Sequence, residues 1–273
     1  MSPDNLTYLQ STPLFQGITE AALKGFIKNC SITELDVGER LHINRRNLAE
    51  VPISIVFEGC LAIHANTAYG KHKIIVLALV MPFQLVGEYQ YFGDELPDRL
   101  EVIAIHKTRV LSFSPNSLRE LIKGFPVVNH NLAKTILLKQ HISNFRLEAV
   151  CQTKGDHKIA TLLTGFIRIP EWLPTSYADL HFKQEMSLPI MWSVELMTRF
   201  LSCNVRTVRD GLWTLVEAKL ITIQWFDHEL RPLNDVDAEH LQDLGKRHGR
   251  VDDKTYFRIS IPAPNKLEEY CGE

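Results

Sequence analysis

The sequence of 273 residues is poor in cysteine, and no two cysteines have the spacing of a metal or redox motif. The five cysteines are scattered along the chain, with no Cys-x-x-Cys among them: Cys30, Cys60, Cys151, Cys203 and Cys271. An odd number without pairs argues against a disulfide framework and against a zinc ribbon. We therefore expect reduced thiols and a cytoplasmic protein.

Long apolar runs are also missing. The longest, residues 74–82, is far shorter than the roughly 20 residues that span a membrane. The first ten residues, MSPDNLTYLQ, lack the basic start and apolar core of a signal peptide. We expect a soluble protein that is not exported and has no membrane partner.

An excess of charge of one sign is absent too. With 30 Lys+Arg against 32 Asp+Glu the net charge is −2, which excludes a generally basic protein that coats nucleic acid. A hydrophobic content of 45% is enough to form a core, which excludes disorder. The sequence also has no Gly-x-Ser-x-Gly, no Gly-x-x-x-x-Gly-Lys and no His-Glu-x-x-His. These absences predict a protein that is not an enzyme.

The first half of the chain has the texture of a small β structure. Residues 12–30 have nearly helical apolar spacing and predict one or two short helices. From residue 31 to about 114, short β-branched runs alternate with glycines, which is typical of consecutive antiparallel strands joined by tight turns. The clearest runs are 53–57, 60–65 and 73–80, and Gly70 lies at a predicted turn. We expect an antiparallel β-roll or sandwich.

Residues 127–151 predict one long helix, because they contain neither glycine nor proline. At 1.5 Å per residue it would be about 37 Å long. One stripe on it has apolar residues at intervals of 4, 3 and 4, the spacing of a coiled-coil seam: Leu138, Ile142, Phe145 and Ala149. The stripe is either a core face or the interface of a symmetric dimer. We favour the dimer, because a long helix beside a small roll leaves apolar surface uncovered.

A hinge at residues 153–156 follows the long helix, and the next apolar spacing predicts an amphipathic helix from about residue 155. Residues 167–189 contain three prolines and predict a structured loop or a strand pair. Beyond them, residues 193–221 carry the strongest functional signal. Ser193 and Asn204 are suitable N-caps for two short helices joined by a turn at Ser202-Cys203. This arrangement predicts a helix-turn-helix, whose second helix enters the major groove of DNA.

The polar side of the second helix has the chemistry to read base pairs. Arg206 can donate two hydrogen bonds to guanine, and Asp210 can accept one from cytosine N4. Thr207, Arg209 and Ser193 are better suited to phosphates, which fix register. With the cap residue, the predicted DNA-binding set is Ser193, Asn204, Arg206, Thr207, Arg209 and Asp210. The alternative is a helical hairpin with a solvated charged face.

The charge of this segment is only slightly positive, so we expect affinity to depend on dimerisation and on the basic residues Lys246, Arg247 and Arg250. Residues 220–225 and 229–233 predict a strand pair directly after the second helix, which is the order of a winged helix-turn-helix. Residues 246–273 form a C-terminal extension that either adds a strand to the wing or packs loosely.

The order of roll, long helix, hinge and winged helix-turn-helix resembles the Crp/Fnr superfamily of bacterial transcription regulators. Particular residues carry the resemblance from about residue 12 to 243: Leu14-Phe15, Gly38-Glu39, Gly59, Gly70, Gly87-Glu88 before Tyr91-Phe92, Ile159-Ala160 and Thr207-Val208. Residues 235–244 look like the closing helix of many members.

The resemblance implies an α+β chain with four parts. They are a cyclic-nucleotide-binding-like β-roll sensor (1–126), a dimerisation helix and hinge (127–154), a winged helix-turn-helix (155–245) and the extension (246–273). It implies a homodimeric, sequence-specific regulator whose partners are double-stranded DNA, a second copy of the chain and RNA polymerase. The alternative is a ligand-binding or protein-interaction module of the same fold that does not bind DNA.

The effector stays open. In relatives that bind cyclic AMP, a Gly-Glu pair and a downstream Arg-Ser or Arg-Thr hold ribose and phosphate, which the resemblance assigns to Gly87, Glu88 and Arg99. Ser143 and Asn144 lie near the position of the base contacts. This sequence departs from the family's pattern in two ways. Leu100 replaces the phosphate-binding hydroxyl, and the interval from Gly87 to Arg99 is one residue longer than in the family.

Other cofactors have less support. An iron–sulfur cluster needs several cysteines near the N-terminus, where only Cys30 is found. A haem needs an axial ligand, and a lone histidine is more often a surface or hydrogen-bonded residue. The candidate axial ligands are His42, His64, His72 and His106. A roll filled by its own side chains, or one that binds another small molecule or a protein, is the main alternative.

Overall fold

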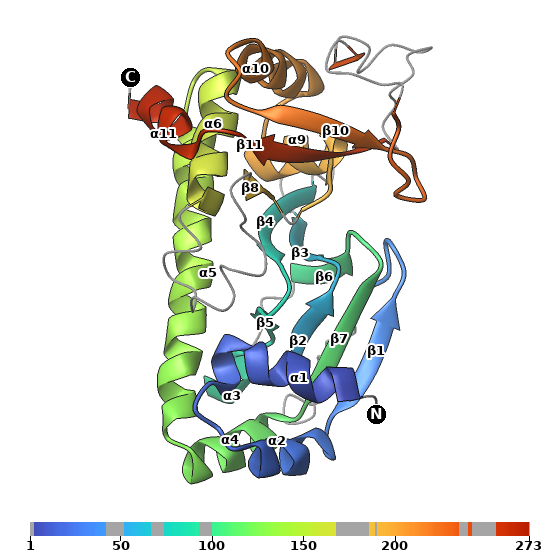
Figure 1. The fold of residues 1–273 in the computed structure, drawn as a ribbon, viewed down its shortest axis with the longest axis vertical. Helices are drawn as coiled ribbons and strands as arrows, with labels where there is room; N and C mark the ends of the chain where they lie inside the picture. The colour runs from blue at the N-terminus through green and yellow to red at the C-terminus, as the bar shows by residue number, and fades with distance from the viewer. Residues whose placement is uncertain are drawn as a thin grey trace. The chain divides into compact units, whose positions relative to one another are not determined.

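The structure, a computed structural model, describes residues 3–41, 52–66, 74–92, 100–167, 186–188, 190–234, 240–241 and 255–272. The chain forms two compact units, Met1–Lys139 and Gln140–Glu273. The division falls inside the long helix α5 (Val127–Cys151), which is drawn in green in Figure 1.

The first unit opens with α1 (Pro3–Ser11), the 3-10 turn η1 (Pro13–Phe15) and α2 (Glu20–Ile27). The helix α2 and the turn lie within the predicted helical stretch of residues 12–30, whereas α1 was not predicted. Thr19 caps α2, because its Oγ1 accepts a hydrogen bond from the backbone N–H of Ala22 at 3.4 Å.

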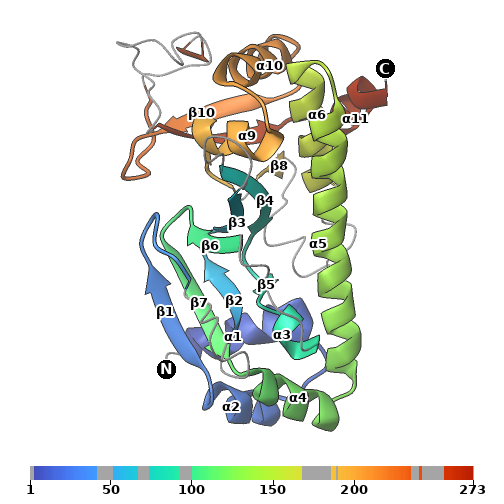
Figure 2. The same ribbon diagram turned by 180° about the vertical axis from the view of Figure 1, so that it is seen from behind.

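The predicted antiparallel β-roll is confirmed (Figure 2). One sheet has the order β1-β7-β2-β5 and the other the order β4-β3-β6, and every pairing in them is antiparallel. The strands are β1 (Ser31–Leu35), β2 (Ile53–Glu58), β3 (Leu61–Asn66), β4 (Ile74–Val80), β5 (Leu85–Val86), β6 (Leu100–Ala104) and β7 (Thr108–Phe113). Gly59 makes the β2–β3 turn at a φ of +83°, where a Cβ would lie 2.3 Å from the carbonyl oxygen of Lys107.

The interior of the roll is filled by its own apolar side chains. All seven strands contribute to one buried cluster or border it: Leu35, Val56, Leu61, Val80, Val86, Val102, Ala104 and Val110. A second cluster joins β2, β5 and β7 to the N-terminal helices and α4 (Pro115–Gly124). Burial of this much apolar surface is the main stabilising contribution to the first unit.

The long helix runs from Val127 to Cys151, as the absence of glycine and proline predicts. Its N-terminal part is joined to the first unit by Asn131, which donates hydrogen bonds to the carbonyl oxygens of Leu14 and Gln16 at 3.2 and 2.9 Å. The predicted break follows, and α6 (Gly155–Ile167) begins the next segment. The helix α3 (Tyr89–Phe92) completes the first unit.

The second unit is a helix-turn-helix on a small antiparallel sheet. The helices α9 (Val194–Leu201) and α10 (Val205–Glu217) lie with α6, and the sheet has the order β10-β11-β8, with β9 also paired to β11. Its strands are β8 (Met186–Ser187), β9 (Trp192–Ser193), β10 (Thr222–Phe226) and β11 (Tyr256–Ile261). The chain ends with α11 (Pro264–Gly272).

The partner strand of the wing is different from the predicted one. Residues 229–233 form only a single bridge, Phe226↔Pro232, whereas β10 pairs along its whole length with β11. In β11, buried side chains alternate strictly with more exposed ones, and the buried side chains are Phe257, Ile259 and Ile261. The sequence left two alternatives for residues 246–273, an added wing strand or loose packing. In the structure, β11 adds a strand to the wing.

Several predictions concern residues outside the described ranges. They are the turn at Gly70, the effector candidate Arg99, the haem candidates His42 and His72, most of residues 167–189 and 235–244, and the basic residues Lys246, Arg247 and Arg250.

Candidate nucleic-acid interface

The first helix of the motif forms as predicted. Ser193 caps α9, since its Oγ accepts a hydrogen bond from the backbone N–H of Leu196 at 3.1 Å. The predicted apolar face is confirmed, because its four side chains are all at most 8% exposed: Leu196, Met197, Phe200 and Leu201. The turn then reverses at Ser202, which has a left-handed conformation with φ of 52° and ψ of 42°.

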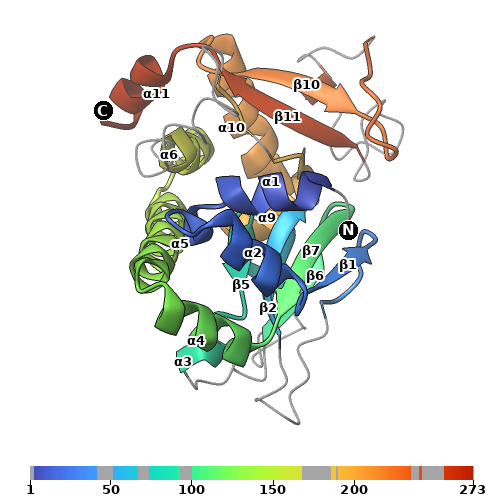
Figure 3. The ribbon, with the colours of Figure 1, turned by 60° about the horizontal axis from the view of Figure 1, so that its bottom comes forward.

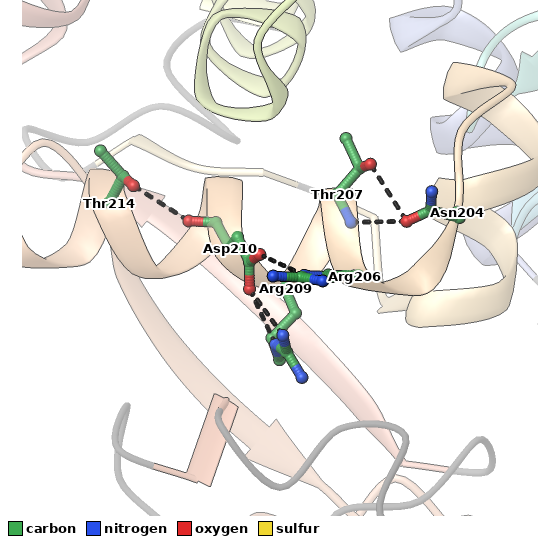
Figure 4. A network of polar contacts seen from close by, with 6 residues as sticks. All are labelled: Asn204, Arg206, Thr207, Arg209, Asp210 and Thr214. Atoms are coloured by element: carbon green, nitrogen blue, oxygen red, sulfur yellow. Dashed lines mark hydrogen bonds and ion pairs between the residues drawn. The ribbon is translucent and has the colours of Figure 1, made fainter.

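The second helix is also capped at the predicted residue. Asn204 Oδ1 accepts hydrogen bonds from the backbone N–H of Thr207 at 2.8 Å and from its Oγ1 at 3.1 Å (Figure 4). Val208, Leu212 and Leu215 are buried, while Arg206 and Asp210 are exposed on the opposite face. The amphipathic pattern therefore orients the polar side of α10 outwards.

Three side chains of this polar side form one network (Figure 4). Arg209 donates to Asp210 Oδ1 from Nε at 2.9 Å, and its Nη2 lies 2.8 Å from the same oxygen. Arg206 Nε lies 3.4 Å from Asp210 Oδ2, and the Arg206 side chain is 82% exposed. Asp210 thus orients two guanidinium groups from one helix, and the three groups together carry a net charge of +1.

The structure brings five of the six predicted residues together and places the sixth elsewhere. Asn204, Arg206, Thr207, Arg209 and Asp210 lie on the N-terminal half of α10 (Figure 4). Ser193 lies one helix earlier, where it also pairs with Tyr256 of β11.

Sequence reasoning missed the close approach of α6 to α10. A Cβ on Gly155 would lie 2.4 Å from the carbonyl oxygen of Thr207, and a Cβ on Gly211 would lie 2.5 Å from the carbonyl carbon of Gly155. Backbone meets backbone at these glycines, and the side chain nearest to Gly155 is that of Thr207, whose Cγ2 would lie 3.0 Å from the same Cβ. The two glycines are the only signal in the sequence that could have indicated the contact.

The wing presents a polar face of its own. Paired positions Thr222↔Ser260 and Gln224↔Arg258 carry hydroxyl, amide and guanidinium groups, and Arg258 lies over the ring of Phe226 at 5.3 Å. The turn after β10 is closed by Asp227, which accepts hydrogen bonds from the backbone N–H groups of Arg231 and Glu229. The hydrogen bond from Arg231 is the largest of several effects that lower the pKa of Asp227.

Of the effector candidates in the first unit, Gly87 and Glu88 lie in the described residues. Lys139 of α5 donates to the Glu88 carboxylate and to the carbonyl oxygen of Leu85, the latter at 3.1 Å. Both side chains of this ion pair are only 15% exposed. One oxygen of the carboxylate that the resemblance assigns to a ribose, Oε1, is therefore paired with an ammonium group, while Oε2 is buried without a hydrogen-bond partner among the described residues. Gly87 adopts a φ of +88° directly before it.

Ser143 and Asn144 belong to the second unit, where Asn144 is exposed and accepts a hydrogen bond from Gln140 at 3.0 Å. Leu100 stands in place of a phosphate-binding hydroxyl and Glu88 is paired to Lys139, and both features depart from the cyclic-nucleotide pattern that the resemblance implies.

The predicted seam of the long helix is part of the protomer's own core. Leu138, Ile142 and Ala149 are 8, 4 and 0% exposed, and the Phe145 side chain lies against Gly165 of α6. The three buried residues are therefore not available to a second copy, and Phe145 is half-buried. The opposite face of α5 has exposed residues at alternating intervals of 3 and 4: His130, Ala133, Leu137, Gln140, Asn144, Leu147 and Cys151.

Among the residues described, no group of three histidine, cysteine or acidic side chains is arranged to hold a metal ion. Of the haem candidates within these ranges, His64 and His106 are buried, at 6 and 7% exposed. None of the described helices combines the length and apolarity that a membrane crossing needs.

The sequence matches no protein-family model and no curated protein. The structure is similar to that of FixK2 from Bradyrhizobium japonicum, with a TM-score of 0.56 at 14% identity over 88% of this chain and 96% of that one. It is similar to CooA from Carboxydothermus hydrogenoformans (TM-score 0.55, 13% identity, 90% of each chain). It is also similar to CprK in complex with OCPA (TM-score 0.53, 13% identity, 91% and 93%). These likenesses confirm the fold that the resemblance implies.

Proposed function

We propose that the protein is a homodimeric, sequence-specific transcription regulator that binds double-stranded DNA through α10. The observation that carries the proposal is the exposed face of α10, where Arg206 and Arg209 are oriented by Asp210 on a helix that follows a tight turn. The fold shared with FixK2, CooA and CprK supports it. RNA polymerase is the protein on which such a regulator would act.

Arg206 is the proposed base-reading residue. Its contact with Asp210 uses Nε, so both terminal nitrogens remain for guanine O6 and N7. Asp210 contacts both arginines in the free protein, Arg206 through Oδ2 and Arg209 through Oδ1. We therefore assign Asp210 as the residue that positions Arg206.

The remaining residues of the set are proposed phosphate contacts. Asn204 uses its Oδ1 for the cap, so its amide NH2 group is left to donate to a phosphate. Ser193 directly precedes α9, and Thr207 lies in the first turn of α10. Both are therefore at the positive end of a helix dipole. Arg209 supplies the cation that such a cluster needs.

A second copy of the chain is the proposed occupant of the exposed face of α5. Leu137 and Leu147 are 60 and 56% exposed, although both are large apolar side chains. The exposed positions of this face recur over three heptads with the spacing of a two-stranded coiled coil. Gln140 and Asn144 lie between the two leucines, and polar residues in such a seam influence register and oligomer state at a cost in stability. Two recognition helices would then face half-sites about 10 bp apart.

Selection from a random duplex library at about physiological salt tests the proposal. The expected result is an enriched two-fold motif, with affinity that falls steeply as salt rises because several phosphates are neutralised. Arg206→Ala should cost about 1–3 kcal/mol at one base step and relax specificity there. Arg40→Ala is the matched control, since Arg40 is an exposed arginine of the first unit that pairs with Glu101.

No enrichment and no salt dependence would overturn DNA binding and favour a module that binds a protein or a small ligand. An equal loss by Arg206→Ala on all sequences would instead reassign Arg206 to a phosphate contact.

A further inference from the structure

The C-terminal helix α11 packs along α6 in the second unit (Figure 3). The Tyr270 hydroxyl donates a hydrogen bond to Asp156 Oδ2 at 2.5 Å, and the Tyr270 ring lies 5.2 Å from the ring of His157. One residue further on, Cys271 Sγ lies 3.4 Å from Thr164 Oγ1. The last described turn of the chain is thus attached to α6 at two places, through Cys271 to its C-terminal half and through Tyr270 to its first turn.

The same turn of α6 touches the proposed recognition helix. Gly155, the neighbour of Asp156, lies against the carbonyl oxygen of Thr207, and a Cβ on Gly211 would lie 2.7 Å from the backbone nitrogen of Asp156. Backbone lies on backbone here, and the side-chain atom nearest to the Cβ position of Gly155 is Cγ2 of the stiff, β-branched Thr207, so no long flexible side chain absorbs a shift of α6. A displacement of this turn must therefore move the N-terminal half of α10.

Asp156 is held from several sides. Its side chain is 16% exposed, and it lies at the N-terminus of α6, where a carboxylate interacts favourably with the helix dipole. His157 Nε2 lies 3.9 Å from Asp156 Oδ2. Next to them, Lys158 donates to the carbonyl oxygens of Val150 and Ala149 near the end of α5, at 2.5 and 3.4 Å. Tyr270 is the contact that comes from the C-terminal helix.

We propose that Tyr270 is a positioning residue for DNA binding. By holding Asp156 it fixes the start of α6, and through the contact between Gly155 and Gly211 it fixes the orientation of α10. The C-terminal segment then has two roles in DNA binding. The strand β11 pairs with β10 in the wing, and α11 positions the recognition helix through α6. This inference rests on the DNA-binding function proposed above.

Tyr270→Phe tests it, because the variant keeps the ring beside His157 and loses only the hydroxyl. We expect affinity for the selected DNA to fall about 10- to 100-fold, the size of one hydrogen bond to a charged group. Amide hydrogen exchange of residues 205–211 should become faster, while that of the first unit stays unchanged. Asp156→Ala should lower the affinity to the same extent, and the double variant with Tyr270→Phe should lower it no further. Asp156→Asn keeps an acceptor and should therefore retain most of the wild-type affinity.

Tyr8→Phe is the matched control. Tyr8 donates to the carbonyl oxygen of Val56 at 2.8 Å, so this variant loses a comparable hydroxyl in the first unit. It should lower stability and leave exchange in α10 as in the wild type. DNA affinity and α10 exchange that are unchanged in Tyr270→Phe would overturn the inference. If the wild type selects no DNA, the proposed function is wrong. Amide hydrogen exchange of residues 205–211 in Tyr270→Phe then still tests whether Tyr270 holds α10 in place.

Discussion

The ammonium group of Lys139 lies on the carboxylate of Glu88, 51 residues earlier in the chain. Glu88 follows β5 of the roll and Lys139 lies on α5, so this ion pair ties the long helix to the roll within the first unit. Both side chains are 15% exposed. Charged groups that are this well buried are usually paired, because an unpaired charge loses its hydration without compensation.

Glu88→Gln should lower the free energy of unfolding by about 1–3 kcal/mol, because it leaves the Lys139 ammonium buried without its counter-charge. Chemical denaturation measures this loss, and the charge-exchanged double variant Glu88→Lys with Lys139→Glu should recover part of it. Glu101→Gln is the matched control. It breaks a pair in which Arg40 is 61% exposed, so its effect should stay below about 1 kcal/mol. Equal effects of the two single variants would contradict a special contribution of the buried pair.

Cyclic AMP should leave the thermal midpoint of the wild type unchanged. A ligand stabilises a protein only as far as it binds the folded state, and the carboxylate assigned to the ribose already has a partner in Lys139. Calorimetric scans with and without millimolar cyclic AMP measure this. A rise in the midpoint that depends on concentration and disappears in Glu88→Gln would show that the roll accepts the nucleotide after all.

Asp210→Ala should raise affinity for non-specific DNA and lower the preference for the selected motif about tenfold. The variant removes a negative charge and releases Arg206 and Arg209, so one more phosphate contact becomes available and the salt dependence steepens by about one counterion. Fluorescence anisotropy at several salt concentrations separates the two effects. Glu217→Ala makes the same charge change at the C-terminal end of α10 and should leave specificity intact. A loss restricted to one base step would mean that Asp210 itself reads a cytosine.

Leu137→Glu should dissociate the proposed dimer without unfolding the protomer, because Leu137 is 60% exposed. Ile142→Glu should unfold it, because a charge would enter a position that is only 4% exposed. Sedimentation and circular dichroism distinguish the two outcomes.

Disulfide trapping gives an independent measurement of the same seam, since a two-fold axis along it brings the two Cys151 residues face to face. Burial raises the pKa of the Cys30 and Cys60 thiols to about 12, so an oxidant at pH 8 leaves them unreacted. Cys151→Ser should abolish the cross-linked dimer and Cys203→Ser should not. A wild type that sediments as a monomer at micromolar concentration would remove the basis of this prediction.

Stability should fall as pH drops below about 4, and Tyr270→Phe should weaken this dependence. Burial by itself raises the pKa of Asp156, but the hydrogen bonds from Tyr270 and from the backbone outweigh it, and the pKa is lowered. An unfolded aspartate has a pKa of about 3.9. A carboxyl group whose pKa is lower in the folded than in the unfolded state stabilises the fold at pH values above the unfolded pKa. This contribution is lost as pH falls through the folded pKa.

Urea denaturation at pH 5 and pH 3 measures this dependence. Tyr8→Phe serves again as the control, because its hydroxyl donates to a backbone carbonyl and not to a carboxylate. An identical loss between the two pH values in the wild type and in Tyr270→Phe would contradict the assignment.

Local features were predictable wherever the physical cause is local. The long helix has its predicted bounds because nothing between Val127 and Cys151 interrupts a helix. Both helices of the motif start at the predicted caps Ser193 and Asn204, since a cap needs only its own side chain and a backbone N–H three residues later.

Which face of a helix is covered was not predictable in the same way. The stripe containing Leu138 and Ile142 and the face containing Leu137 and Leu147 both carry large apolar side chains on the same helix. Periodicity identifies such stripes but not their neighbours, and the choice depends on elements far away in the chain. The predicted dimer seam proved to be core for this reason.

The sequence by itself determined the order of the elements, the antiparallel roll, the caps and the polar face of α10, because each follows from short-range periodicity and backbone chemistry. Only the tertiary structure decided that β11 completes the wing, that Lys139 pairs with Glu88 and that α11 reaches Asp156. These contacts join residues tens of positions apart. Such pairings depend on how whole elements fill space together, and no single segment contains that information.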